Sequence, residues 1–234
     1  GPGNRALLDR LVAWGARVRV PTTLNASSAC LSSGAPGDPE AQAGARGMVE
    51  RYLSLGCQPT LTCAPYQSAD VPGFGECIAW AESNAVVYAN SVLGARTNHT
   101  VQYLDLAAAL TGRIPRTGLY REARRRPTVD VEASVLCHEG VRRQGGFALL
   151  GLWIGGWTSR KDVPLIRGLS EDTSKDELRT LGAAAASAGG LAMFHAEGLT
   201  PESPGARSRA ADRLLPHRKV TREILETVAG RFSA

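Results

Sequence analysis

Three groups of polar side chains come directly after short apolar runs of the chain. The first is Thr22 to Asn25, the second is Thr62 to Tyr66, and the third is His195 with Glu197 and Thr200. Hydroxyl, thiol, imidazole and carboxylate groups of this kind bind substrates, hold metals and move protons. If the apolar runs are parallel strands, these groups lie at the strand ends where α/β proteins bind their ligands.

A fourth candidate is Glu82, which interrupts an otherwise apolar stretch and is followed by Ser83 and Asn84. A carboxylate in such a stretch either faces solvent on the polar side of a helix or is placed there for chemistry, such as accepting a proton. The pattern alone favours the solvent-facing interpretation, and both stay open at this point.

The five cysteines are irregularly spaced, at Cys30, Cys57, Cys63, Cys77 and Cys137. No Cys-x-x-Cys pair occurs, so a zinc ribbon and a thioredoxin-like redox site are unsupported. An odd number of cysteines in a chain without a secretion signal indicates free thiols in a reducing cytosol. We expect most of them to be small buried apolar residues, although any one could be a metal ligand.

Predicted helices and short apolar strands alternate along the chain. These elements position the candidate residues. Apolar residues at helical spacing predict helices, and short apolar runs bounded by turn residues predict strands. The predicted helices are Leu7–Trp14, Glu40–Leu55, Glu76–Val92, Gln102–Leu110, Ser174–Ala186 and Thr221–Arg231, and the predicted strands are Val18–Pro21, Thr60–Cys63, Val163–Ile166 and Leu191–Phe194. This alternation predicts an α/β fold with a largely parallel sheet flanked by helices.

The net charge of +5 is concentrated in one segment of the 234-residue chain. Between Arg113 and Arg126, six arginines face one acid, Glu122, so this segment carries the whole excess. It contains no recognisable nucleic-acid-binding motif, and its one aromatic residue is Tyr120, so a nucleic-acid binder is disfavoured. Hydrophobic residues make up 43% of the chain, as in folded proteins, yet no apolar run approaches the ~20 residues of a membrane span. We therefore expect a cytosolic protein with neither a nucleic-acid nor a membrane partner.

The order of several short blocks resembles the catalytic domain of aconitase X. The blocks are Pro21–Asn25, Thr62–Tyr66, the twenty residues Ala79–Asn98, Val163–Gly168 and Thr200–Glu202. The resemblance extends from about Gly3 to Glu202, and the block of twenty residues is its most specific part. It implies an aconitase-like layered α/β domain, with residues 1–200 as a partial catalytic domain and residues 201–234 as a linker and C-terminal helix of the same domain.

The resemblance also implies an activity, a cofactor and partners. Members of the family are hydro-lyases that eliminate water from small hydroxy acids, with cis-3-hydroxy-L-proline and mevalonate 5-phosphate as substrate types, and they use an iron or iron-sulfur centre. A small swivelling domain or subunit closes over the substrate. Carried over to this chain, the metal ligand is Cys63, the catalytic residues are Glu82, Ser83 and Asn84, and the substrate-binding residues are Thr23, Asn25, Tyr66, Arg96, Thr97, Arg125 and His195.

The chain departs from the family pattern in an internal segment and at both ends. The family's Gly-Leu-His and Glu-Asn-Arg motifs correspond to residues 118–125, where Tyr120 replaces the histidine, Ala123 and Arg124 replace the acid and the amide, and Arg125 is kept. Cys30 stands where the family has an acid. The family's terminal segments are not found, which predicts a fragment or split gene product that needs them as partners. The alternative is a catalytically inactive remnant that acts as a binding module, and the exact substrate and the full ligand set stay open.

Overall fold

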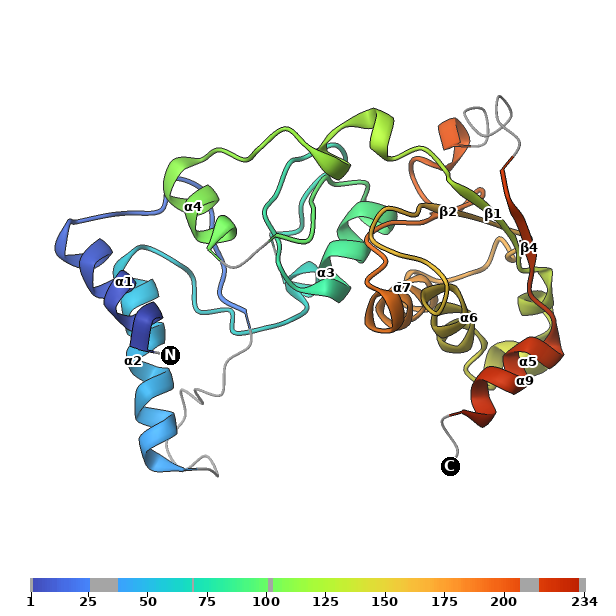
Figure 1. The fold of residues 1–234 in the computed structure, drawn as a ribbon, viewed down its shortest axis with the longest axis horizontal. Helices are drawn as coiled ribbons and strands as arrows, with labels where there is room; N and C mark the ends of the chain where they lie inside the picture. The colour runs from blue at the N-terminus through green and yellow to red at the C-terminus, as the bar shows by residue number, and fades with distance from the viewer. Residues whose placement is uncertain (1, 26–37, 69, 101–102, 207–214, 232–234) are drawn as a thin grey trace. The chain divides into compact units, whose positions relative to one another are not determined.

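The computed structural model describes residues 2–25, 38–68, 70–100, 103–206 and 215–231 of the chain (Figure 1). The chain forms two compact units. The N-terminal unit comprises residues 1–70 and 101–115, and the sheet unit comprises residues 71–100 and 116–234. Each unit contains buried hydrophobic clusters made of its own residues.

Three helices build the N-terminal unit: α1 (Pro2–Ala13), α2 (Pro39–Ser54) and α4 (Leu104–Thr111). The Asp38 carboxylate caps the start of α2 by accepting two backbone N–H groups, and Gly112 ends α4 in the left-handed conformation that glycine adopts without strain. Leu8, Leu55 and Leu106 form the buried centre. The three helices that the sequence predicts for this unit are confirmed.

The two strands predicted in this unit, Val18–Pro21 and Thr60–Cys63, are not formed. Among its described residues, one parallel bridge joins Thr23 to Gln58, and a short 3-10 turn, η1 (Pro65–Gln67), follows further along. The pairing does not extend because Leu61 takes a left-handed backbone conformation, with φ of 46°, that a straight strand cannot contain.

A four-stranded parallel sheet is the centre of the sheet unit. Its strands are β1 (Val129–Glu132), β2 (Pro164–Arg167), β3 (His195–Ala196) and β4 (His217–Lys219), in the order β3-β2-β1-β4. The predicted α/β fold with a parallel sheet is confirmed, and β2 lies where a buried strand is predicted. The sequence patterns do not predict β1 or β4, because both are short and carry charged residues.

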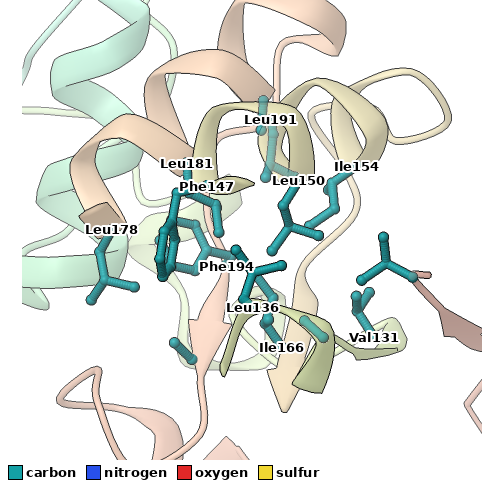
Figure 2. Packing of buried hydrophobic residues seen from close by; sticks show 14 of the residues in the cluster. Val131, Leu136, Phe147, Leu150, Ile154, Ile166, Leu178, Leu181, Leu191 and Phe194 are labelled. Atoms are coloured by element: carbon teal, nitrogen blue, oxygen red, sulfur yellow. The ribbon is translucent and has the colours of Figure 1, made fainter. Parts of the chain in front are cut away.

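Helices α5 (Glu139–Arg143), α6 (Gly146–Gly155), α7 (Lys175–Gly189) and α9 (Arg222–Gly230) lie together on one side of this sheet (Figure 1). Figure 2 shows the core, in which Leu150 of α6, Leu181 of α7 and Ile166 of β2 belong to one buried cluster. The helix predicted from Ser174 is confirmed as α7, and a capping box begins it, since Ser174 and Glu177 each bind the other's backbone N–H group. The predicted C-terminal helix is confirmed as α9.

The approach of α6 to α7 depends on glycine. A Cβ atom on Gly151 would lie 2.3 Å from the carbonyl oxygen of Leu181, and one on Gly155 would lie 2.7 Å from that of Ala185. A Cβ atom on Gly189 would lie 2.0 Å from the carbonyl oxygen of Gly155. The two helix backbones are therefore nearly in contact. The sequence patterns do not predict α6, because glycine disfavours helices and this segment is apolar on every side.

The helix predicted over Glu76–Val92 is wrong in its first seven residues. Helix α3 (Ser83–Tyr88) continues into one π-helical turn, η2 (Ala89–Leu93), but residues 76–82 are not helical. Instead, Cys77 forms a parallel bridge with Arg96, whose amide donates to the carbonyl of Glu76. Pairing with the segment after η2 thus replaces the helical hydrogen bonds.

The strand predicted over Leu191–Phe194 is also misplaced, since β3 begins at His195. The predicted residues are buried, but side chains bind their backbone: Asn90 Nδ2 donates to the Ala192 carbonyl, and the Ser91 hydroxyl accepts the Phe194 amide. In the linker predicted to begin at residue 201, residues 203–206 form a helical turn and residues 207–214 lie outside the described chain. The remaining 3-10 turns are η3 (Gly118–Tyr120), η4 (Glu122–Arg124) and η5 (Ser134–Cys137).

Candidate functional site

In the N-terminal unit, two of the predicted polar groups lie side by side. The segment with Thr23 and Asn25 runs parallel to the segment that leads to Cys63, because the Leu24 carbonyl accepts the Thr62 amide at 3.3 Å. Thr23 is half-buried, whereas Asn25 and Cys63 are exposed. Pairing of the two segments therefore brings together candidates that are nearly forty residues apart in sequence.

The loop that carries Cys63 has an unusual backbone. Leu61 is one of two non-glycine residues with positive φ among the described residues, and such conformations cost about 1–3 kcal/mol and are concentrated at functional sites. Tyr66 follows Cys63 in η1 and is buried. The Tyr66 ring is buried, and the Thr62 hydroxyl accepts the Ala64 amide at 3.0 Å. These two contacts give the loop a defined shape.

The described residues fit an iron centre only in part. The Cys63 thiol is exposed and could bind a metal, whereas burial raises the pKa of the Cys57 thiol and so disfavours the thiolate that a metal requires. Across the described ranges, no group of three or more His, Cys, Asp or Glu side chains is arranged to hold a metal ion. Cys30 lies outside those ranges. One ligand of a centre can thus be named here, but not a complete set.

In the sheet unit, Glu82, Ser83 and Asn84 lie at the start of α3. Glu82 is the residue before the helix, with ψ of 127°, and its carbonyl accepts the Val86 amide at 2.9 Å. All three candidates are half-buried. Glu82 is therefore the residue that precedes the helix and not, as expected, a residue within it, and its half-buried position leaves both interpretations of its carboxylate open.

Arg96 follows the π-helical turn and binds a carboxylate of the protein itself. Its Nη2 lies 2.6 Å from Oε2 of Glu122, and its Nη1 donates to the Tyr120 carbonyl at 3.3 Å. The Arg96 side chain is 23% exposed and that of Glu122 is 52% exposed, so water reaches the pair. A pair of this kind adds little to stability, and it places the guanidinium in contact with a carboxylate oxygen at a position that water reaches.

Thr97 is fully buried, and its neighbours use all of its polar groups. The Thr97 amide donates to Asn90 Oδ1 at 3.0 Å, and the Thr97 carbonyl accepts Asn90 Nδ2 at the same distance. The Thr97 hydroxyl accepts the Trp80 amide at 3.3 Å and donates to the Asn98 carbonyl at 3.2 Å. The side chain of Asn90 therefore holds both backbone groups of Thr97.

Arg125 is also fully buried, and protein acceptors take all five of its N–H groups. Nε lies 2.9 and 3.1 Å from the two oxygens of Glu202, and Nη1 donates to Asn90 Oδ1 at 3.0 Å and to the Leu119 carbonyl at 3.1 Å. Nη2 donates to the carbonyls of Asn90 and Ala95 and lies 2.5 Å from Glu202 Oε1. No N–H is left for a substrate, so the structure gives Arg125 the geometry of an internal cross-link in place of the expected substrate contact.

Two buried rings lie next to this cross-link. His195 is fully buried at the start of β3, and its Nε2–H donates to the Arg125 carbonyl at 2.7 Å. Tyr120 donates its hydroxyl hydrogen to the Ile78 carbonyl at 2.8 Å. Burial raises the pKa of Tyr120 above its ordinary value of 10.0, so the phenol stays protonated at neutral pH. A phenol in this state is not available as a base at neutral pH, as a neutral imidazole would be.

The sheet unit thus brings Thr97, Arg125 and His195 into one buried network, with Arg96 at its exposed border. Asn90 and Glu202 complete the network but are not among the residues that sequence reasoning selects. Asn90 is a polar residue within an apolar stretch, a signal that could have identified it. Glu202 follows Thr200-Pro201, and only the fold reveals that its carboxylate is buried against Arg125.

Family models and known proteins match most of the chain. The model for the first domain of aconitase X matches residues 1–123, and the model for the second domain matches residues 127–229. Cis-3-hydroxy-L-proline dehydratases from Pseudomonas aeruginosa and Hypocrea jecorina are 40% and 39% identical to it, and a phosphomevalonate dehydratase large subunit from Thermococcus kodakarensis is 38% identical. These alignments cover 89%, 87% and 86% of this chain but 36%, 34% and 49% of the relatives, so the chain spans between a third and a half of their length.

A solved structure extends this similarity to the fold. The crystal structure of aconitase X from Thermococcus kodakaraensis in its holo-form matches with a TM-score of 0.86 and 35% sequence identity, over 100% of this chain and 56% of that chain. The predicted aconitase-like fold is therefore confirmed. Within the described residues, no helix is both long enough and apolar enough to cross a membrane.

Proposed function

The chain belongs to the aconitase X family, and from this premise we propose that it forms part of a hydro-lyase that eliminates water from a small hydroxy acid such as cis-3-hydroxy-L-proline. The matched relatives are named as dehydratases. The observation that carries the proposal is the contact of Arg96 with a carboxylate at a water-accessible position. A substrate carboxylate has the same chemistry as the Glu122 side chain that it would replace.

Elimination of water requires a base for a carbon-bound proton and an acid for the departing hydroxyl. Glu82 is the proposed base, because it is the one carboxylate among the catalytic candidates, and Ser83 and Asn84 offer polar groups that orient the substrate. Arg96 would fix the substrate carboxylate through its planar pair of N–H donors. Thr23, Asn25 and Tyr66 are the proposed substrate-binding residues of the N-terminal unit. We assign Thr97, Arg125 and His195 to the support of Arg96, because their polar groups are bound within the protein.

Cys63 is the proposed ligand of an iron or iron-sulfur centre. When bound, such a centre supplies Lewis acidity toward the departing hydroxyl. Relatives are called large subunits, so we propose that a small swivelling subunit or domain, together with further segments of the large domain, completes the site. A cytosolic location is part of the same proposal.

The test is to produce the chain together with the proposed small subunit or domain and the other segments of the large domain, and to load the protein with iron without oxygen. Dehydration of cis-3-hydroxy-L-proline is expected. Arg96→Lys should lower kcat/KM about ten-fold or more, because the bidentate geometry is lost, whereas Arg126→Lys, at an exposed position next to Arg125 in the sequence, should leave it unchanged. Absence of turnover in iron-loaded protein, or equal turnover by Arg96→Lys, would contradict the proposal.

Binding without turnover is the second candidate function. The ring of Tyr120 is hydrogen-bonded inside the protein where the family has a histidine, which favours a site that recognises a carboxylate but lacks one of the family's functional groups. Calorimetry distinguishes the two functions. An iron-loaded protein that binds cis-3-hydroxy-L-proline, loses that binding in Arg96→Lys and forms no product would be a binding module.

A further inference from the structure

The buried ion pair of Arg125 and Glu202 connects segments that are distant in sequence. The Arg125 side chain is 0% exposed and that of Glu202 is 8% exposed. Glu202 lies beyond β3, 77 residues from Arg125. Removing one partner of such a pair leaves an uncompensated buried charge, so neither residue can change freely. This arrangement requires an explanation beyond the filling of space, because an apolar pair would fill the same volume without desolvating two charges.

The pair is bonded to the turn that precedes Arg96. Arg125 Nη2 donates to the carbonyls of Asn90 and Ala95, at 2.9 and 3.1 Å, and these carbonyls lie in and just after the π-helical turn. Gly94 ends that turn with φ of 72°. The guanidinium N–H groups thus take the place of the backbone N–H donors that a continuing helix would have supplied. They hold the chain at the point where the helix ends.

Asn90 transmits this constraint to the residue next to Arg96. Its Oδ1 accepts both Arg125 Nη1 and the Thr97 amide, each at 3.0 Å, while its Nδ2 binds the Thr97 carbonyl. The orientation of the Asn90 amide is therefore fixed by Arg125, and the backbone of Thr97 is fixed by Asn90. Arg96 lies between Ala95 and Thr97, so both of its neighbours are bonded to this network.

We propose that Arg125, paired with Glu202, is a positioning residue: it fixes Asn90 and the 95–97 backbone so that the Arg96 guanidinium is held ready for a substrate carboxylate. The inference rests on the proposed role of Arg96 in binding that carboxylate. It assigns Arg125 no contact with the substrate. It also predicts that the charge on Glu202 matters for binding at Arg96, because Glu202 Oε1 and the Ala95 carbonyl are bound by the same nitrogen, Arg125 Nη2.

Amide hydrogen exchange tests the positioning directly, because the Thr97 amide donates to Asn90 Oδ1. In Arg125→Lys, and in the isosteric Glu202→Gln, Thr97 exchange should be at least about ten-fold faster, while amides of Leu150 and Leu181 in the α6–α7 core keep their protection. Arg126→Lys is the matched control and should change neither. Equal acceleration at all three amides, or no change at Thr97, would overturn the proposal. If both ion-pair variants fail to fold, Asn90→Ser keeps the pair and must give the same local acceleration.

Calorimetric titration with cis-3-hydroxy-L-proline separates this inference from the function on which it rests. If the wild-type chain binds, Arg125→Lys should weaken binding about five-fold or more, and unchanged binding would overturn the positioning role. If wild-type protein in its complete assembly does not bind, the proposed function fails. The exchange of Thr97 then still decides whether Arg125 sets the local backbone, and its result alone supports or overturns that part of the inference.

Discussion

Arg96 Nη2 and Glu122 Oε2 lie 2.6 Å apart, so the arginine proposed to recognise a substrate carboxylate is paired with a carboxylate of its own chain. Glu122 belongs to η4, within the arginine-rich segment, and its side chain is the more exposed partner. A ligand that used the same N–H group of Arg96 would have to displace it. Glu122 is therefore expected to compete with the carboxylate of the proposed substrate.

Replacing Glu122 by Gln should strengthen carboxylate binding. The variant removes the competing charge, so we expect the Kd for cis-3-hydroxy-L-proline to fall about three- to ten-fold, while the free energy of unfolding changes by about 0–1 kcal/mol because the pair is exposed. Calorimetry and chemical denaturation measure the two quantities. Glu139→Gln, which breaks the exposed pair with Arg143, is the control and should not alter binding. Weaker binding by Glu122→Gln would indicate that Glu122 supports the ligand.

The α6–α7 contact should not tolerate a single added methyl group. Gly151→Ala places a Cβ atom against the Leu181 carbonyl, a backbone atom that cannot move away cheaply, so we expect a loss of about 1–3 kcal/mol in the free energy of unfolding. Gly140→Ala in α5 is the matched control, because nothing lies within 4 Å of its Cβ position and alanine favours helices. Urea denaturation measures both variants. Equal stability of the two would show that the helices separate at little cost.

The stabilisation from the contact between α5 and α7 should decrease at low pH. Hydrogen bonds from Arg142 lower the pKa of Glu177 from 4.5 to about 2, although partial burial opposes the shift. A lowered pKa in the folded protein means that this stabilisation is complete above about pH 4.5 and is lost as the pH falls toward 2. The urea midpoint of the wild type should therefore fall across this range. The slope should be smaller in Glu177→Gln, and an unchanged slope would exclude Glu177 as its source.

Replacing Cys63 should reduce iron binding more than replacing Cys57. After anaerobic loading, Cys63→Ser is expected to contain less iron and to show weaker visible absorption, because the exposed thiol is the proposed ligand. Cys57→Ala is the control, since that thiol is buried and has a raised pKa. Iron content by elemental analysis measures both. Equal iron content in Cys63→Ser and the wild type would remove Cys63 from the proposed ligand set.

Signals confined to a few neighbouring residues predicted the structure well. The capping box at Ser174 and the glycine at position 112 mark helix ends by local hydrogen bonding and backbone conformation, so α7 and α4 could be placed from sequence. The ordered blocks of residues also identified the family. These features do not depend on which distant segment packs against them.

Features set by distant contacts could not be predicted in this way. Residues 76–82 are apolar enough for a helix but pair with the chain after η2, and the glycines of α6 meet a helix that begins about twenty residues later. The same limit applies to the candidate site. Arg125 has the chemistry of a substrate-binding residue, and only the positions of Glu202 and Asn90 reveal that its donors are all used inside the protein.

The two hydrogen bonds accepted by one oxygen of Asn90 have a thermodynamic consequence. Because Arg125 and the Thr97 backbone share that acceptor, the energetic effects of changes at Asn90 and Arg125 should not add, with an interaction energy of about 0.5–3 kcal/mol in a double-mutant cycle. Substitutions that are each harmful could then be tolerated as a pair. Asn90 and Arg125 would in that case act as one energetic unit within the domain.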